Sequence, residues 1–302
     1  MRSTSIRWLF IVLALAACVT PGLAAAAPPN VLIVLVDDAG YGDFSCLGNP
    51  VMKTPHCDKL HGESIRLTDF HVCPMCTPTR GQIMTGVHCL RNGAMNVSSG
   101  RTPLRRSVPT MADVFLAGGY ATGHFGKWHL GDTYPYRPID RGFQESITCR
   151  SWGMASAADY WNNCCFDDHY WHNGAAKQLP GYNTDVFFAA AIQWMKAAKD
   201  KNTPFFVYLP TTAVHGPHFV ADKYRAPYKD QKPQVASFFG MLANLDENLA
   251  KLDAFLDQEK LRDNTILIFM TDNGGTAGVP VYNAGMRGGK TQLYEGDRKS
   301  VV

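Results

Sequence analysis

Three continuous apolar runs constrain the fold of this chain more than any other feature. They are Asn30–Asp38 (NVLIVLVDD), Pro204–Leu209 (PFFVYL) and Thr265–Thr271 (TILIFMT). None of them alternates apolar with polar residues, which is typical of strands buried on both faces in a parallel sheet. Helical patterns lie between them, at Asp185–Lys199 and at spacings of three and four from Phe239 to Leu256. This alternation predicts an α/β fold, a doubly wound and mostly parallel sheet with helices on both faces.

Polar side chains follow each of these runs. Asp37 and Asp38 end the first, His215 follows the second, and Asp272 and Asn273 follow the third. Sites in such sheets form at the carboxyl ends of the strands. Adjacent carboxylates repel each other unless a cation neutralises them, and oxygen-only ligands suit Ca²⁺ or Mg²⁺. Each pair alone would be interpreted as a helix N-cap, but two pairs on parallel strands favour one metal site.

The beginning of the chain is typical of a targeting signal. Arg2 and Arg7 precede an apolar run, Trp8–Val19, that is short for a membrane span. We therefore predict a signal peptide over residues 1–27, a mature domain over 28–302, and export to the periplasm or the medium. No later segment is apolar enough for a transmembrane helix.

Two endings of this signal compete. The small residues Ala25–Ala27 favour ordinary cleavage, which we prefer, whereas Leu15–Cys18 resembles a lipobox that would lipidate Cys18. Without Arg2 and Arg7 the chain has 27 basic and 26 acidic residues. That balance gives no reason to expect a nucleic-acid partner.

Cysteines supply the most specific motif. The segment from Cys73 to Gly81 reads CPMCTPTRG. By residue type alone, Cys76 would be interpreted as a buried or disulfide cysteine, and the pairing of the exported cysteines cannot be deduced from sequence. Yet Cys76-x-Pro-x-Arg80, continued by the hydrophobic residue, Thr and Gly of residues 84–86, resembles the signature of the sulfatase family. Thr79 stands where that family often has Ser.

Further segments resemble sulfatase elements in the same order. They are Asp37-Asp38, Lys127-Trp128-His129, His215-Gly216-Pro217, Asp272-Asn273, and Gly289-Lys290 followed by Tyr294-Glu295-Gly296. The resemblance covers nearly the whole mature chain. It implies an alkaline-phosphatase-like fold, conversion of Cys76 to formylglycine by a maturation enzyme, and a bound cation, Ca²⁺ rather than Mg²⁺. The implied metal ligands are residue 76 together with Asp37, Asp38, Asp272 and Asn273.

The implied reaction is hydrolysis of aryl or carbohydrate sulfate esters. Arg80, Lys127 and Lys290 would supply positive charge around the sulfonyl oxygens. The hydrated aldehyde at residue 76 would offer one hydroxyl, acidified by Ca²⁺, to attack sulfur and a second to expel sulfate. His215, with Lys290, would protonate the leaving group, and His129 would assist the hydroxyls of residue 76. These two histidine assignments could be exchanged.

The resemblance weakens at the end of the chain. The family pattern continues with a second Gly, then Arg and Pro, whereas Asp297 follows Gly296 here and the sequence stops at Val302. We expect the smaller C-terminal domain to be missing, which would leave an exposed, unpaired sheet edge. An inactive truncated remnant is therefore one alternative function. A phosphate or phosphonate monoesterase on the same scaffold is the other, although such enzymes usually share the charge between two metals.

One segment has no clear place in this scheme. Residues 149–182 are rich in Trp, Tyr, Asn, Asp and Cys and show weak periodicity. We interpret them as a long excursion from the sheet, which either shapes a substrate cleft or is a structural surface loop.

Overall fold

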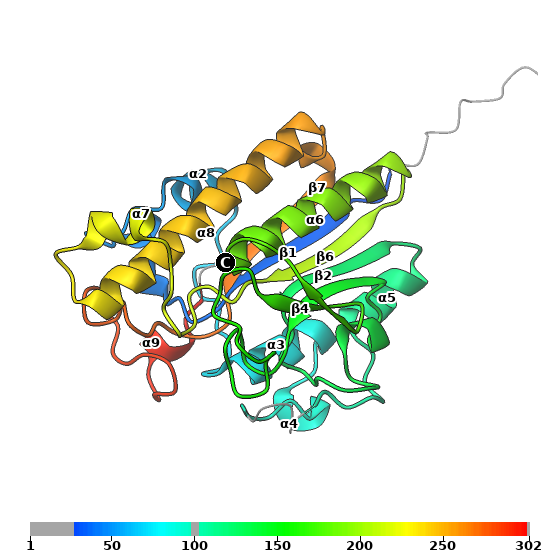
Figure 1. Cartoon of the computed structure of the whole chain (residues 1–302), viewed down its shortest axis with the longest axis horizontal. Helices are drawn as coiled ribbons and strands as arrows, with labels where there is room; N and C mark the ends of the chain where they lie inside the picture. Colours follow the sequence, from blue (N-terminus) through cyan, green and yellow to red (C-terminus); the bar gives the residue numbers. More distant parts are fainter. Residues whose placement is uncertain (1–26, 98–102, 301–302) are drawn as a thin grey trace, which may run out of the picture.

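The computed structural model describes residues 27–97 and 103–300, and a seven-stranded sheet forms its centre (Figure 1). The strands are β1 (Asn30–Val36), β2 (Ala121–Lys127), β3 (Glu145–Cys149), β4 (His169–His172), β5 (Ala175–Gln178), β6 (Phe205–Pro210) and β7 (Thr265–Thr271). Their order across the sheet is β5-β4-β3-β2-β6-β1-β7. All pairings from β3 to β7 are parallel, and β4 and β5 add an antiparallel edge. The prediction of a mostly parallel sheet is confirmed.

The burial of β1 explains why its sequence is apolar without alternation. Leu32 and Val34 point into the core on one face of the sheet, whereas Ile33 and Leu35 point into a second core on the other. Because both faces are covered, every position of the strand loses its contact with water, and each buried aliphatic side chain contributes about 1.5–3 kcal/mol.

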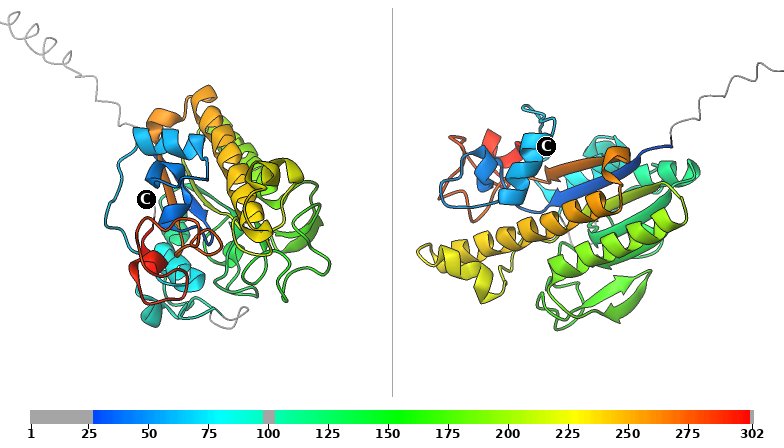
Figure 2. Two further views of the ribbon diagram at one scale, coloured as in Figure 1. Left: turned by 90° about the vertical axis from the view of Figure 1, so that its left-hand side faces the viewer. Right: turned by 90° about the horizontal axis from the view of Figure 1, so that it is seen from above.

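Helices cover both faces. They are α2 (Pro55–Glu63), α3 (Cys76–Thr85), α4 (Cys89–Asn92), α5 (Met111–Ala117), α6 (Asn183–Asp200), α7 (Asp222–Arg225), α8 (Pro233–Gln258) and α9 (Glu295–Arg298). Short 3₁₀ turns lie at Tyr41–Asp43, Ser45–Leu47, Pro138–Asp140, Ala226–Tyr228 and Arg262–Asn264. The long helices α6 and α8 lie on one side of the sheet, and α3 and α5 lie on the other (Figure 2). Both predicted helices are confirmed, within α6 and α8, and so is the doubly wound arrangement.

The expectation that residues 149–182 leave the sheet is partly wrong. After an irregular stretch the chain returns as β4 and β5, and Ile147 and Thr148 of β3 pair with His172 and Trp171 of β4. These strands have four residues each and lie at the sheet edge, where one face can meet water. Their sequences therefore lack the long apolar run that reveals a central strand.

The opposite edge of the sheet is β7. Among the described strands it pairs with β1, and its outer residues are partly open, with Ile266 50% exposed. Ile65, on the segment after α2, is 90% exposed close to the groove that β7 forms with α2. An exposed apolar edge is thus present within the described chain.

The predicted signal peptide, with Cys18, lies outside the described residues apart from Ala27. Within residues 27–97 and 103–300, no helix combines the length and apolarity needed to cross a bilayer.

Candidate active site

The candidate site lies where the carboxyl ends of β1, β2, β6 and β7 meet. Asp37 and Asp38 follow β1, Lys127 ends β2, and Asp272 follows β7. Gly126 allows β2 and β6 to approach each other closely there, because a Cβ on it would lie 1.9 Å from the carbonyl oxygen of Pro210. No other residue type fits at that position without moving the strands.

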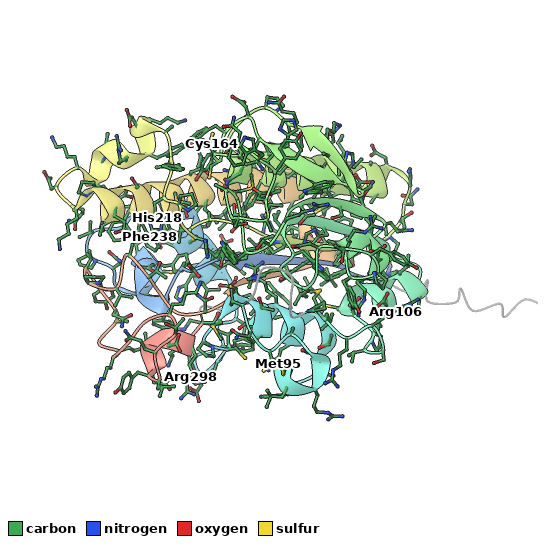
Figure 3. All side chains as sticks on the ribbon, turned by 60° about the horizontal axis from the view of Figure 1, so that its bottom comes forward. Met95, Arg106, Cys164, His218, Phe238 and Arg298 are labelled. Atoms are coloured by element: carbon green, nitrogen blue, oxygen red, sulfur yellow. The ribbon has the colours of Figure 1, made fainter. Side chains whose placement is uncertain are left out.

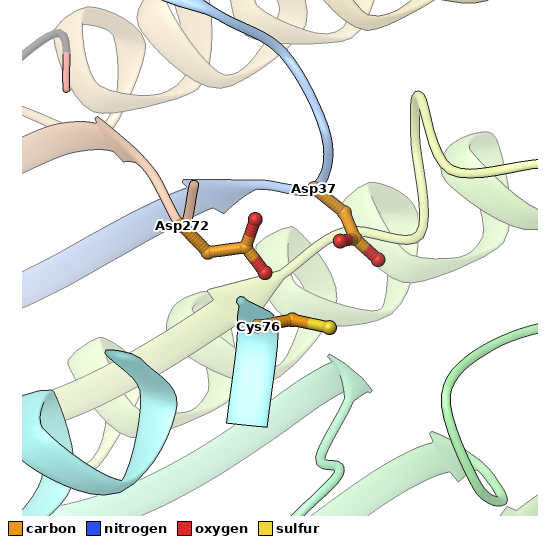
Figure 4. A group of neighbouring side chains, drawn as sticks. All are labelled: Asp37, Cys76 and Asp272. Carbon is orange, nitrogen blue, oxygen red and sulfur yellow. The ribbon is translucent and has the colours of Figure 1, made fainter. Parts of the chain in front are cut away.

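A cluster of three ligand-type side chains forms the centre of the site. Ligand atoms of Asp37, Cys76 and Asp272 all lie within 4.8 Å of one another, and all three residues are buried (Figure 4). Oδ1 of Asp37 and Oδ1 of Asn273 are buried without a hydrogen-bond partner. A buried carboxylate oxygen with a free lone pair is costly unless a cation or donor meets it, so this donor set fits a hard, oxygen-preferring cation.

Two buried cations hold these carboxylates. The Arg80 guanidinium donates from Nε (3.0 Å) and from one terminal nitrogen (2.8 Å) to the same oxygen of Asp272, and from the other nitrogen to the carbonyl of Lys127 (2.8 Å). The Lys127 ammonium donates to Asp37 Oδ2 at 2.5 Å. All four side chains of these two pairs have no exposed area. Burial and the neighbouring charge of Asp37 raise the pKa of Asp272, although Arg80 opposes this shift.

Asp38 lies nearer the opening of the site. Its Oδ1 accepts hydrogen bonds from Lys290 and, at 3.0 Å, from the side-chain amide of Asn273. Burial pushes the pKa of Asp38 upward, but His215 and Lys290 outweigh it and hold the pKa below its usual value. Burial lowers the pKa of Lys290, but the Asp38 carboxylate, together with Asp37 and Asp272, outweighs burial and keeps that pKa above its ordinary value. The pair is therefore ionised at neutral pH.

The two histidines differ in environment. Both ring nitrogens of His129 are buried without a partner, and burial followed by the charges of Lys127 and Arg80 lowers its pKa well below the usual value. His129 is therefore neutral. His215 is 20% exposed, and its Nδ1 lies 2.6 Å from the carbonyl oxygen of Gly216. Because a carbonyl only accepts, Nδ1 carries a proton, which leaves Nε2 facing Asp38 Oδ2 at 3.8 Å.

Backbone conformation is unusual at two of these positions. Asp38 and His129 adopt left-handed conformations, with φ of 62° and 59°. Non-glycine residues in this region are uncommon and concentrate at functional sites, where surrounding contacts hold them.

Cys76 is the first residue of α3 and is 1% exposed. Burial raises the pKa of its thiol; Lys127 opposes this shift, while Asp37 and Asp272 add to it. The Thr79 hydroxyl accepts a hydrogen bond from the backbone nitrogen of Cys73 at 2.9 Å. This contact needs only a side-chain hydroxyl at position 79, which Thr and Ser both have, and this explains why Thr79 can stand where the sulfatase family often has Ser.

All predicted site residues come together at one end of the sheet. The side-chain amide of Asn273 donates a hydrogen bond to Asp38, and this pair lies beside the central cluster of Asp37, Cys76 and Asp272. The sequence analysis missed two buried hydroxyls without partners, those of Ser151 and Thr212. Each follows the carboxyl end of a strand, β3 and β6, which is the signal that would have found them.

Comparison with known proteins gives a consistent result. A family model described as Sulfatase matches residues 29–299. Human arylsulfatase A is 31% identical over an alignment 328 residues long, gaps included. This alignment covers 95% of this chain and 60% of the relative. The N-acetylgalactosamine-6-sulfatase of Canis lupus familiaris is 25% identical, covering 91% of this chain and 57% of the relative. The chain thus spans somewhat more than half the length of these relatives.

Solved structures agree with the fold. The crystal structure of Ps i-CgsB in complex with k-i-k-neocarrahexaose superposes with a TM-score of 0.83 at 26% identity. That match covers 91% of this chain and 65% of the other.

Proposed function

The chain belongs to the sulfatase family, with its alkaline-phosphatase-like fold, and on this premise we propose that it hydrolyses sulfate esters. One observation carries the proposal: the thiol of Cys76 lies with the carboxylates of Asp37 and Asp272 in one buried cluster. The residue to be converted to the nucleophile therefore lies directly beside the groups that would hold a cation.

The charges of the site suit an anionic ester. Three carboxylates, Asp37, Asp38 and Asp272, face three cations, Arg80, Lys127 and Lys290. A bound divalent cation would leave the cluster positive, and a buried site with preorganised charges stabilises negative charge far better than water does.

We assign the cation to Asp37, Asp38, Asp272, Asn273 and residue 76, and we expect Ca²⁺ rather than Mg²⁺. The fit rests on the unpartnered buried oxygens of Asp37 and Asn273 and on a donor set that is almost entirely oxygen. When bound, Ca²⁺ would make the cluster positive and would acidify a hydroxyl of residue 76.

The nucleophile in this proposal is a formylglycine made from Cys76, in its hydrated form. One hydroxyl attacks sulfur, the bond from sulfur to the ester oxygen breaks, and the alcohol leaves with a proton. The second hydroxyl then loses its proton, the aldehyde forms again, and the bond from residue 76 to the sulfate breaks. An ordinary serine lacks the second hydroxyl and has no internal route for this last step.

Two histidines would move the protons. His129 is neutral and buried, so its free ring nitrogen can accept the proton of the attacking hydroxyl. His215 is partly exposed near Lys290 and Asp38, where a leaving alcohol would depart toward solvent. We therefore assign His215, with Lys290, to leaving-group protonation, and the exchanged assignment is the alternative.

Aryl or carbohydrate sulfates are the proposed substrates, and a formylglycine-generating or equivalent enzyme is the proposed maturation partner. Relatives named arylsulfatase and N-acetylgalactosamine-6-sulfatase support the substrate class. We further propose export to the periplasm or the medium, from the signal-like segment before residue 28.

The test uses the full chain co-produced with a formylglycine-generating enzyme. Mass spectrometry of tryptic residues 67–80 should show an aldehyde at position 76, and p-nitrophenyl sulfate should be hydrolysed much faster than p-nitrophenyl phosphate. Faster turnover of the phosphate or of a phosphonate ester would favour the monoesterase alternative. A protein that carries the aldehyde, is folded and turns over neither ester would be the inactive remnant.

A further inference from the structure

We propose that a groove beside His215 holds the next sugar ring of a sulfated oligosaccharide, and that Phe166 and Phe219 bind that ring. The groove lies between the segment of residues 149–182 and the chain that follows β6, and Cys164 and His218 mark these two sides in Figure 3. Its volume is about 310 Å³, within the range of ligand clefts, about 300–1,000 Å³. This role rests on the proposed function, which assigns His215 to the leaving group.

The groove continues from the candidate active site. Nδ1 of His215 lies 2.6 Å from the carbonyl oxygen of Gly216, and a Cβ on Gly216 would lie 3.9 Å from Nε2 of His218. Cys165 and Pro217 line a smaller hollow next to His215, and the residues that adjoin them in sequence line the groove. An alcohol that extends past His215 therefore reaches the groove.

Two aromatic rings offer their surface there and are fixed in place. Phe166 is 37% exposed, and its ring packs against that of Tyr182 with 5.0 Å between the centroids. Phe219 is 50% exposed, and its backbone nitrogen donates to the carbonyl of Pro217 at 3.0 Å. Because both rings are already held, a ligand that contacts them loses little affinity to ordering of the protein.

Packing against α8 fixes the wall that follows β6. The ring of His218 meets that of Phe238 edge to face, with 5.6 Å between the centroids (Figure 3). A Cβ on Gly240 would lie 2.9 Å from Cγ1 of Val220 and 3.1 Å from the carbonyl carbon of Tyr224. The glycine therefore lets this wall lie directly on the helix, so the groove exists before a ligand binds.

The chemistry of the groove suits an anionic sugar chain. The face of an aromatic ring carries partial negative charge, which attracts the C–H groups of a sugar ring. Arg225 also lines the groove and pairs with Asp222 at 2.6 Å in an exposed contact, which an anionic group of a ligand can replace. A purely apolar ligand would leave this guanidinium unmatched, whereas a sulfated oligosaccharide carries both ring faces and anionic groups.

Titration calorimetry tests the binding without any turnover. The full chain, made without the maturation enzyme so that Cys76 stays a thiol, is titrated in the presence of Ca²⁺ with sulfated tetrasaccharides from chondroitin sulfate, heparin and carrageenan. At least one should bind, and Phe166→Ala and Phe219→Ala should each raise its Kd by ~2–12-fold, the effect of one lost ring contact. Phe219→Tyr keeps the ring and should keep the wild-type Kd.

Trp161→Ala is the matched control. Trp161 belongs to the same segment of residues 149–182 and is 91% exposed, but it lies outside the groove, so its loss should leave the Kd unchanged. Failure of all three tetrasaccharides to bind, an unchanged Kd in both phenylalanine variants, or an equal loss in Trp161→Ala would overturn the proposal.

Kinetics of the aldehyde-bearing protein place the groove on the leaving-group side. The alcohol part of p-nitrophenyl sulfate is a single ring, so Phe219→Ala should lower kcat/KM for the tetrasaccharide relative to that for p-nitrophenyl sulfate by the same ~2–12-fold. An unchanged ratio, or no turnover of the tetrasaccharide by protein that hydrolyses p-nitrophenyl sulfate, would overturn this placement. Protein that binds the tetrasaccharide through both rings but hydrolyses neither ester would instead contradict the proposed function.

Discussion

Replacement of Arg80 by lysine should destabilise the fold strongly although it keeps the charge. The guanidinium makes three donor contacts in one plane, two to an Asp272 oxygen and one to the Lys127 carbonyl, and it is fully buried. A lysine ammonium is a point donor at the end of a longer stem, so it cannot reproduce the fork toward both acceptors.

The cost follows from what is left unpaired. Loss of one hydrogen bond to a charged group costs about 1.5–3 kcal/mol, and a buried acceptor without a partner costs about 1–3 kcal/mol. We therefore expect Arg80→Lys to lower the free energy of unfolding by about 2.5–6 kcal/mol, and the melting temperature by ~2–4 °C for each kcal/mol. The carboxylate of Asp272 keeps a cationic neighbour, so the loss should be smaller than in Arg80→Met, which breaks the buried pair.

Thermal and urea unfolding, followed by circular dichroism at pH 7, measure this loss. Arg225→Lys is the matched control, because Arg225 pairs with Asp222 on the exposed surface of α7, where such pairs are worth about 0–1 kcal/mol. If Arg80→Lys melted within the error of the wild type, or no lower than Arg225→Lys, the argument that the planar fork holds this site together would be wrong.

Four further changes should have measurable effects. Lys290→Ala should lower turnover of an aryl sulfate on the order of 10²–10³-fold, as for loss of one oxyanion donor, and unchanged kcat would remove Lys290 from the site. Cys76→Ser, in a host that modifies only cysteine, should release at most one equivalent of alcohol and then stall, whereas wild-type turnover would contradict the two-hydroxyl mechanism. Chelation should inactivate the enzyme and Ca²⁺ should restore it better than Mg²⁺, with Asp272→Asn needing more Ca²⁺; activity indifferent to chelator would count against the metal. Burial raises the pKa of Asp43 to about 7, so its stabilising contribution is present below about pH 4 and is lost as pH rises through 7. Between about pH 4 and pH 7 the wild type should therefore lose up to about 4 kcal/mol of unfolding free energy, and Asp43→Asn should not show this loss. If urea titrations gave the variant the same pH profile as the wild type, Asp43 would not be responsible.

The strands that could be predicted from the sequence are those whose residues form a continuous apolar run. The runs that became β1 and β6 are apolar throughout because both faces of the sheet are covered there, whereas β7, which is equally apolar, is the sheet edge and is buried mainly at Met270 and Thr271. β2 was not predicted, since its sequence ATGHFGK contains two glycines, a histidine and a lysine. Its residues are nonetheless buried, because His124 packs among Trp128, Phe143 and Tyr208, and Gly126 admits the close approach of β6. Tertiary packing, which no local pattern reports, decides such a strand.

The site residues likewise divide into those that could be predicted from their position in the sequence and those that could not. Asp37, Asp38 and Asp272 could be found from position alone, because acids directly after buried strands must converge at one edge of the sheet. Arg80 and Lys290 could not, because they lie on α3 and on a loop, where no buried strand precedes them to mark their position. Only the resemblance singled them out. Ser151 was missed because β3, the strand that it follows, has no apolar run to mark its end.

The environment of residue 76 supplies a physical reason for modifying it. A thiol is a useful nucleophile only as the thiolate, which needs a lowered pKa. At this position burial raises the pKa of the cysteine, and the carboxylates of Asp37 and Asp272 offset the opposing charges of Lys127 and Lys290, so the pKa stays above its usual value. The same carboxylates are the groups that would hold a cation, so they cannot be removed to activate the sulfur without losing the metal. The proposed replacement of the sulfur by a hydrated aldehyde would resolve this conflict, because a hydroxyl oxygen is a better ligand than a protonated thiol for a hard cation and would bring a second hydroxyl for release of sulfate.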